Sequence, residues 1–194
     1  NWLKNLIEPL KEKDNVASVS KVELPEYFWK NMDLLGRVIS AKEQKIITPL
    51  MDEKGCAYKK SFLIKAGLFN EEEFRTAGED FDMYIKLKKL GKIAYPDCKV
   101  FHFHEHNFKK RLKKEAQLSE GFGALVKIHK KNMPGYLIGL VKAIPFLGWV
   151  VFFAGFPYFR KPFLGIFWIP ISILIHFIYV KNFWKGFKSG KQVI

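Results

Sequence analysis

Three features of this 194-residue sequence predict a mixed α/β fold whose C-terminal part associates with a membrane. Short apolar segments of strand and helix periodicity alternate in the first half, which indicates layered strands and helices. A strongly basic helical segment follows. Two long, nearly uncharged segments then occupy the C-terminal part, and such segments are rare in soluble domains. We therefore divide the chain into an α/β part (1–106), a basic amphipathic helix at the membrane interface (107–133) and a membrane hairpin with a basic tail (134–194).

The composition indicates an anionic partner. The formal net charge is +14, and the chain contains 19 Phe and 5 Trp residues. Lysine combined with aromatic residues suits a membrane surface as well as a nucleic acid. No helix-turn-helix, zinc-finger or aromatic RNA-binding motif is visible, so membrane lipid is the expected partner and nucleic acid is not. Cys56 and Cys98 lack metal-ligand spacing and are expected to be free thiols in a reducing compartment.

The first 80 residues predict short elements. Apolar side chains recur at helical spacing in residues 1–12, which predicts an amphipathic helix. The elements expected after it are a strand (16–22), a helix (27–38), a short strand (55–58), a helix capped by Ser61 and ended by Gly67, and an acidic loop (71–78).

The next 50 residues predict a helix over 82–90, strands over 92–95 and 99–104, and a basic helix over 107–131 that breaks near Gly121–Gly123. In the strand over 99–104, a period of two places Phe101 and Phe103 on one face. Val100, His102 and His104 share the other face.

The two apolar segments, 136–159 and 163–180, are long enough to cross a bilayer. Lysine and arginine flank both of them, whereas only Arg160 and Lys161 lie between them. The positive-inside rule then predicts two spans with both flanks, and hence the α/β part, on the cytoplasmic side. Two buried core helices, and a first segment that forms a re-entrant or surface-lying hairpin, are the alternatives.

Carboxylates cluster at Gly78–Asp82, where Glu79, Asp80 and Asp82 open a predicted helix. Clustered acids raise each other's pKa, so a sequence that keeps them usually has a use for them. Asp80 and Asp82 spell the metal-binding string Asp-x-Asp, but residues two apart on a helix point about 200° away from each other. One carboxylate acting as a general base fits better. Capping of the helix N-terminus is the alternative, and local sequence alone favours it.

His102 and His104 follow about twenty residues later on one face of the predicted strand. Single histidines on a strand face are usually ordinary surface residues. Two of them near an acidic helix start favour contact with a metal or a phosphate.

Together these segments resemble the C-terminal half of a family 2 glycosyltransferase with the Rossmann-like GT-A fold. The resemblance covers about residues 1–131 and rests on residues 55–58, 66–69, 78–82, 91–96 and 100–104. It implies that Asp80 is the catalytic base with Glu79 beside it. It also implies that Gly55, Cys56 and Asp82 contact the substrate, and that His102 and His104 contact a divalent metal or the diphosphate.

The resemblance implies inverting transfer of a sugar from a nucleotide-diphosphate donor to a lipid-linked or membrane-proximal saccharide acceptor. The family's nucleotide-binding strands, and the acidic motif that holds Mg²⁺ or Mn²⁺, have no counterpart in this sequence. We therefore expect the acceptor half with its membrane anchor, inactive alone, with the main metal ligands upstream. The processive-synthase motif Gln-x-x-Arg-Trp is also missing, which favours transfer of single sugars. The alternative function is a non-catalytic basic module that binds anionic lipid or a protein.

Overall fold

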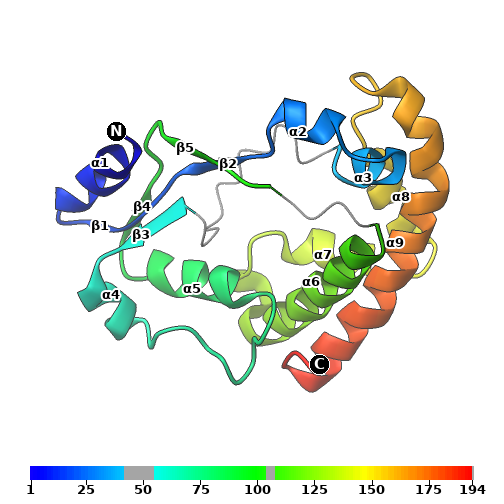
Figure 1. The fold of residues 1–194 in the computed structure, drawn as a ribbon. Helices are drawn as coiled ribbons and strands as arrows, with labels where there is room; N and C mark the ends of the chain where they lie inside the picture. The colour runs from blue at the N-terminus through cyan, green and yellow to red at the C-terminus, as the bar shows by residue number, and fades with distance from the viewer. Residues whose placement is uncertain (42–54, 104–107, 194) are drawn as a thin grey trace.

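The computed structural model describes residues 1–41, 55–103 and 108–193 (Figure 1). The first half contains α1 (Trp2–Ile7), a short 3-10 helix (Glu8–Lys11), β1 (Asn15–Val19), β2 (Lys21–Glu23), α2 (Glu26–Lys30), α3 (Leu34–Ile39), β3 (Cys56–Tyr58), α4 (Lys60–Lys65), α5 (Glu79–Lys88), β4 (Lys92–Ala94) and β5 (Lys99–Phe101). The second half is helical, with α6 (Phe108–His129), a 3-10 turn (Lys130–Asn132), α7 (Tyr136–Lys142), α8 (Leu147–Ala154) and α9 (Pro162–Ser189). The predicted mixed α/β fold is confirmed.

Two small sheets organise the first half. The described strands form a three-stranded sheet of order β3-β1-β4 and a parallel pair, β2 with β5. Strand β1 is central: it is parallel to β4 and antiparallel to β3. All five of its residues are buried, as expected for a strand covered on both faces. Figure 1 shows this sheet at one end of the molecule and α9 along the other.

Helix α6 is continuous where a break was expected, and this prediction was wrong. Glycine lowers helix propensity, but tertiary contacts override that preference. A Cβ atom on Gly123 would lie 2.0 Å from the carbonyl oxygen of Phe183 in α9, and one on Gly121 would lie 2.3 Å from that of Ala77. The two glycines therefore allow close packing against neighbouring backbone. The contact between α6 and α9 is the most extensive between any two described elements.

The first apolar segment is not a straight span. It forms α7 and α8, which meet at an angle of 115° around Pro145. Proline lacks an N–H donor and restricts the residue before it, so it commonly ends a helix. The second segment forms α9, which continues through Pro170 for 28 residues. Within the described residues, α9 is the one unbroken helix that is long and apolar enough to cross a membrane.

Three local predictions have different outcomes. Gly67 has a left-handed backbone with φ of 87°, as expected after a helix. Ser61 is not the cap of α4, because the helix begins at Lys60 and Lys59 is the capping residue. Helix α5 begins at Glu79, three residues earlier than predicted, so the acidic cluster lies inside its first turn.

Candidate functional site

The acidic cluster follows a glycine, Gly78, whose backbone adopts a left-handed conformation. Gly78 has φ of 104° and precedes α5 directly. Glycine adopts this conformation readily because it has no Cβ atom, whereas L-amino acids with a side chain rarely do. Glu79 and Asp80 follow as the first two residues of the helix, and both are half-buried. An oxygen of Asp80 accepts a hydrogen bond from the backbone N–H of Phe81 at 2.7 Å. The carboxylate is thus fixed beside the helix N-terminus, where the helix dipole stabilises negative charge.

The topology directs this helix start toward the carboxyl edge of the sheet. Only residues 89–91 separate α5 from β4, so the chain reverses and α5 runs back along β4. Helix α5 contacts both β1 and β4. Strands β1 and β4 are parallel and end at the same edge, where the antiparallel β3 begins. In α/β proteins, ligands bind outside the carboxyl ends of parallel strands, especially where strand order changes.

Two tyrosines connect α5 to that edge. Tyr95, the residue after β4, is hydrogen-bonded to Tyr84 of α5. Partial burial, the charge of Tyr84 and this hydrogen bond raise the pKa of Tyr95 to about 12, with a smaller contribution from Cys56. Tyr95 and Tyr84 therefore lie side by side, which ties α5 to the end of β4. Asp80 is one helical turn before Tyr84, on the same side of α5 and farther toward the edge.

Gly55 and Cys56 lie at this same edge of the sheet. The backbone N–H of Ser20 donates to the carbonyl oxygen of Gly55 at 2.7 Å, and Cys56 pairs with Val19. A Cβ atom on Gly55 would lie 2.0 Å from Oγ of Ser20, so any side chain there would displace Ser20. Gly55 is buried and Cys56 is partly buried. Gly55 and Cys56 thus lie at the carboxyl edge of the three-stranded sheet, toward which the start of α5 is also directed.

Asp82 occupies a different environment from its neighbours. Its side chain is buried, and the residue is 1% exposed. Nε2 of His129, at the end of α6, lies 2.7 Å from one carboxylate oxygen, and Nζ of Lys86 lies 2.6 Å from the other. Asp82 therefore joins α5 to α6, which differs from the substrate-binding role expected from the sequence. His129 lies 47 residues away, and no local pattern indicated it.

Stability should fall at acidic pH through Asp82. Burial raises the pKa of Asp82, but the hydrogen bonds and charges of His129 and Lys86 outweigh burial and hold it below its ordinary value of 3.8. A depressed pKa stabilises the fold above the unfolded-state value, and this contribution is lost as the pH falls through the folded-state value. We expect Asp82→Asn to lower the free energy of unfolding at pH 7 by about 1–3 kcal/mol.

The measurement is denaturant unfolding at pH 7 and at several values below pH 4, with wild type and variant compared. The difference between them should shrink as the pH falls, because protonation removes the same charge that the substitution removes. The exposed acid Glu72 provides the matched control, Glu72→Gln. A difference that stays constant at all pH values would contradict the role given to the Asp82 charge.

His102 continues the pairing of β2 with β5. Its backbone N–H donates to the carbonyl oxygen of Glu23 at 2.9 Å, and its side chain is partly buried. His104 lies outside the described residues. Within the described ranges, no group of three or more His, Cys, Asp or Glu side chains is arranged to hold a metal ion.

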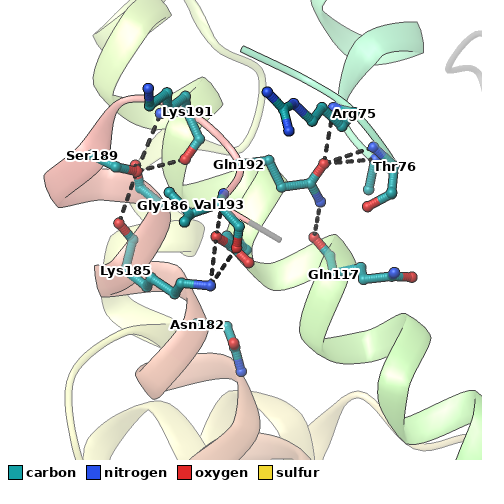
Figure 2. A network of polar contacts seen from close by, with 12 residues as sticks. Arg75, Thr76, Gln117, Asn182, Lys185, Gly186, Ser189, Lys191, Gln192 and Val193 are labelled. Carbon is teal, nitrogen blue, oxygen red and sulfur yellow. Dashed lines mark hydrogen bonds and ion pairs between the residues drawn. The ribbon is translucent and has the colours of Figure 1, made fainter. Parts of the chain in front are cut away.

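The loop before the acidic cluster is held by the C-terminal tail (Figure 2). Oε1 of Gln192 accepts hydrogen bonds from three consecutive backbone N–H groups, those of Arg75, Thr76 and Ala77, at 3.1, 2.7 and 3.2 Å. Its Nε2 donates to the carbonyl oxygen of Gln117 at 3.0 Å. Gln192 is 3% exposed, so these bonds are sheltered from water. A residue that follows α9 thus orders the loop that leads to Glu79.

Nearby contacts hold the tail itself in place. The backbone N–H of Val193 donates to Oε1 of Glu120 at 2.6 Å, and Nζ of Lys185 lies 3.1 Å from the same oxygen. Glu120 is buried in α6. The tail is therefore tied to both long helices. Sequence reasoning did not find this arrangement, because a glutamine near a chain end carries no local signal.

Replacing Gln192 by alanine should loosen the loop. The change leaves three backbone donors without their acceptor, and each unsatisfied buried group costs about 1–3 kcal/mol unless water reaches it. We expect amide hydrogen exchange at Arg75, Thr76 and Ala77 to accelerate by about tenfold or more, since 1.4 kcal/mol corresponds to tenfold. Lys191→Ala, at the exposed neighbouring position, is the control. Equal exchange in the two variants would show that Gln192 does not order the loop.

Fold and site together define a mixed α/β protein with an acidic helix start at the carboxyl edge of its sheet and one long apolar helix. Comparisons with protein families, with curated proteins and with solved structures find no match.

Proposed function

We propose that this chain is the acceptor-side part of an inverting glycosyltransferase related to family 2 enzymes of the GT-A fold. The observation that supports this most is the placement of Glu79 and Asp80. They follow a glycine in the left-handed conformation and begin α5, which packs on β1 and β4 with its N-terminus toward the carboxyl edge of these strands. A carboxylate held at a sheet edge can accept a proton from a hydroxyl that approaches that edge.

In the proposed reaction, Asp80 removes the proton of an acceptor hydroxyl. The oxygen attacks the anomeric carbon of the donor sugar, a new C–O bond forms, and the bond to the nucleotide diphosphate breaks with inversion. Glu79 lies beside the base, and Gly55 and Cys56 line the same edge. Among the described residues, no group of acidic, histidine or cysteine side chains is arranged to hold Mg²⁺ or Mn²⁺. The resemblance assigns contact with the diphosphate to His102 and His104, and of these two the structure describes His102.

The proposed acceptor is a lipid-linked or membrane-proximal saccharide, and the proposed location is the cytoplasmic face of a membrane. One long apolar helix and a net charge of +14 support this location. Charge of this sign attracts the protein to the anionic lipids of the cytoplasmic leaflet.

The test is sugar transfer by the full-length protein. Radiolabelled nucleotide sugars are incubated with the protein and with lipid-linked acceptors extracted from membranes. Transfer of label to the lipid fraction is then measured. The proposal expects transfer from at least one nucleotide sugar. No transfer from any of them would favour the second candidate, a non-catalytic basic module that binds anionic lipid. The exposed apolar side chains of α7, α8 and α9 support that candidate specifically.

A further inference from the structure

Helix α9 is long enough to cross a bilayer, but both of its ends contact the polar part of the molecule. At 1.5 Å per residue, its 28 residues extend for about 42 Å, more than the hydrocarbon core of a bilayer. Just before the helix begins, Nζ of Lys161 lies 3.8 Å from the centre of the Trp29 ring of α2. Just after it ends, Gln192 binds the loop of Arg75–Ala77.

The middle of α9 is also covered on one side. Figure 1 shows α3 beside the first half of α9 and α6 beside the second half, and the element contacts agree. In the second half, a Cβ atom on Gly186 would lie 1.9 Å from the carbonyl oxygen of Glu120 in α6. If α9 crossed a bilayer, these elements would have to cross beside it. Charged side chains are costly in hydrocarbon, and lipid-exposed open sheet edges do not occur there.

The opposite side of α9 is apolar and exposed. Its exposed side chains, among them Phe163, Ile166, Ile173 and Phe177, recur every three or four residues and therefore share one face. Trp168, Ile175 and Phe183 lie on the other face and are buried. This pattern is typical of a helix that lies between a protein core and an apolar environment, and it differs from that of a helix surrounded by lipid.

Helices α7 and α8 add to the exposed apolar surface. The hydroxyl of Tyr179 donates to the carbonyl oxygen of Gly139 in α7 at 3.2 Å, and Nε1 of Trp168 donates to that of Phe152 in α8. Both short helices are therefore fixed to α9. Between them Phe146 is 80% exposed, and Leu137 and Val150 are also exposed. Exposed apolar side chains thus occur on all three C-terminal helices, and apolar patches on a protein surface often mark a membrane or protein interaction site.

We infer that α7, α8 and α9 lie in the plane of one leaflet and attach the protein to an anionic bilayer without crossing it. The membrane face is defined by Leu137, Phe146, Val150, Phe163, Ile166 and Phe177. Basic residues at both ends of α9, such as the exposed Arg160, Lys181 and Lys188, complement anionic headgroups. This inference does not depend on the proposed sugar transfer. It replaces the two-span hairpin predicted from the sequence.

The positions of the two ends of α9 provide a direct test. Arg160→Cys places a thiol at an exposed position just before α9, and Lys191→Cys places one at an exposed position just after it. Each full-length variant is treated with a membrane-impermeant maleimide in sealed inverted vesicles and in right-side-out vesicles. The wild-type protein, with its free Cys56 and Cys98, gives the background. We expect both new thiols to react from the cytoplasmic side only. Reaction of the two from opposite sides would overturn the inference.

A second experiment tests the face itself. Ile166→Glu places a charge on the membrane face. The control, Ile64→Glu, makes the same change on α4, which is distant in sequence from α9. The two side chains are similarly exposed, Ile166 at 65% and Ile64 at 58%. Sedimentation with vesicles of phosphatidylcholine and phosphatidylglycerol measures the binding. We expect Ile166→Glu to weaken binding by about tenfold or more, through lost apolar burial, and Ile64→Glu to leave it unchanged.

Vesicles of phosphatidylcholine alone should bind the wild-type protein more weakly than the mixed vesicles, because the basic residues lose their anionic partners. Equal binding to both kinds of vesicle, or equal effects of the two glutamate variants, would overturn the proposed attachment. Each result is read from lipid binding and is independent of any sugar-transfer measurement.

Discussion

Replacing Asp80 by asparagine in the full-length protein is expected to reduce sugar transfer by about 10²–10⁴-fold, the usual contribution of a general base. The carboxamide has nearly the same shape, and its oxygen can still accept the hydrogen bond from the N–H of Phe81. It cannot take up the proton of an acceptor hydroxyl. The loss should therefore appear in kcat, whereas the affinity for the nucleotide-sugar donor should stay close to that of the wild type.

Two measurements make the Asp80 result specific. Donor binding is followed by calorimetry in the absence of acceptor, and thermal unfolding reports on the fold. Glu72→Gln, which makes the same acid-to-amide change at an exposed position of the preceding loop, should leave transfer unaffected. If Asp80→Asn retains wild-type turnover, Asp80 is not the base and the assignment fails.

The largest effect on the fold is expected at the crossing of α6 and α9. A Cβ atom on Gly186 would lie 1.9 Å from the carbonyl oxygen of Glu120 and 3.1 Å from the backbone nitrogen of Ala124. Both atoms belong to a helix backbone, which cannot move without separating the helices. Overpacking usually costs about 1–3 kcal/mol, so we expect about this loss for Gly186→Ala and more than about 3 kcal/mol for Gly186→Leu.

This cost is large compared with the total stability of a typical protein, about 5–15 kcal/mol. Chemical unfolding of the detergent-solubilised protein, followed by circular dichroism, provides the measurement. Gly155→Ala is the matched control. Gly155 is exposed with φ of −71°, and the nearest atoms to an added Cβ, at 3.2 and 3.5 Å, belong to the preceding turn. Wild-type stability in Gly186→Leu would show that the helices do not cross as closely as the structure indicates.

The sequence predicted the local elements well wherever a short-range pattern controls the backbone. Residue patterns indicated α1, β1, α5 and α6, and the preference of glycine for the left-handed conformation marked Gly67. The single helix predicted over 27–38 was wrong in extent, because the structure has two short helices there, α2 and α3. The continuous course of α6 through Gly121 and Gly123 was not predictable in this way. The contacts that keep these glycines helical come from Ala77 and Phe183, which are distant in the sequence.

In the candidate site too, local features were predictable from the sequence and long-range contacts were not. The acid pair Glu79–Asp80 was visible in the sequence because clustered carboxylates at a helix start form a local pattern. The separate place of Asp82 was not, because it depends on His129 at the end of α6. The support of the preceding loop by Gln192 likewise joins residues more than one hundred positions apart.

By itself, the sequence determined the mixed α/β class, the acidic helix start and the apolar, basic character of the C-terminal part. These properties follow from residue type and spacing along the chain. Only the tertiary structure decided which carboxylate is buried, how the tail holds the loop, and that one side of α9 is covered by α3 and α6. Hydropathy measures how apolar a segment is, whereas packing decides which of its faces remains exposed, and the exposed face determines how the helix can meet a membrane.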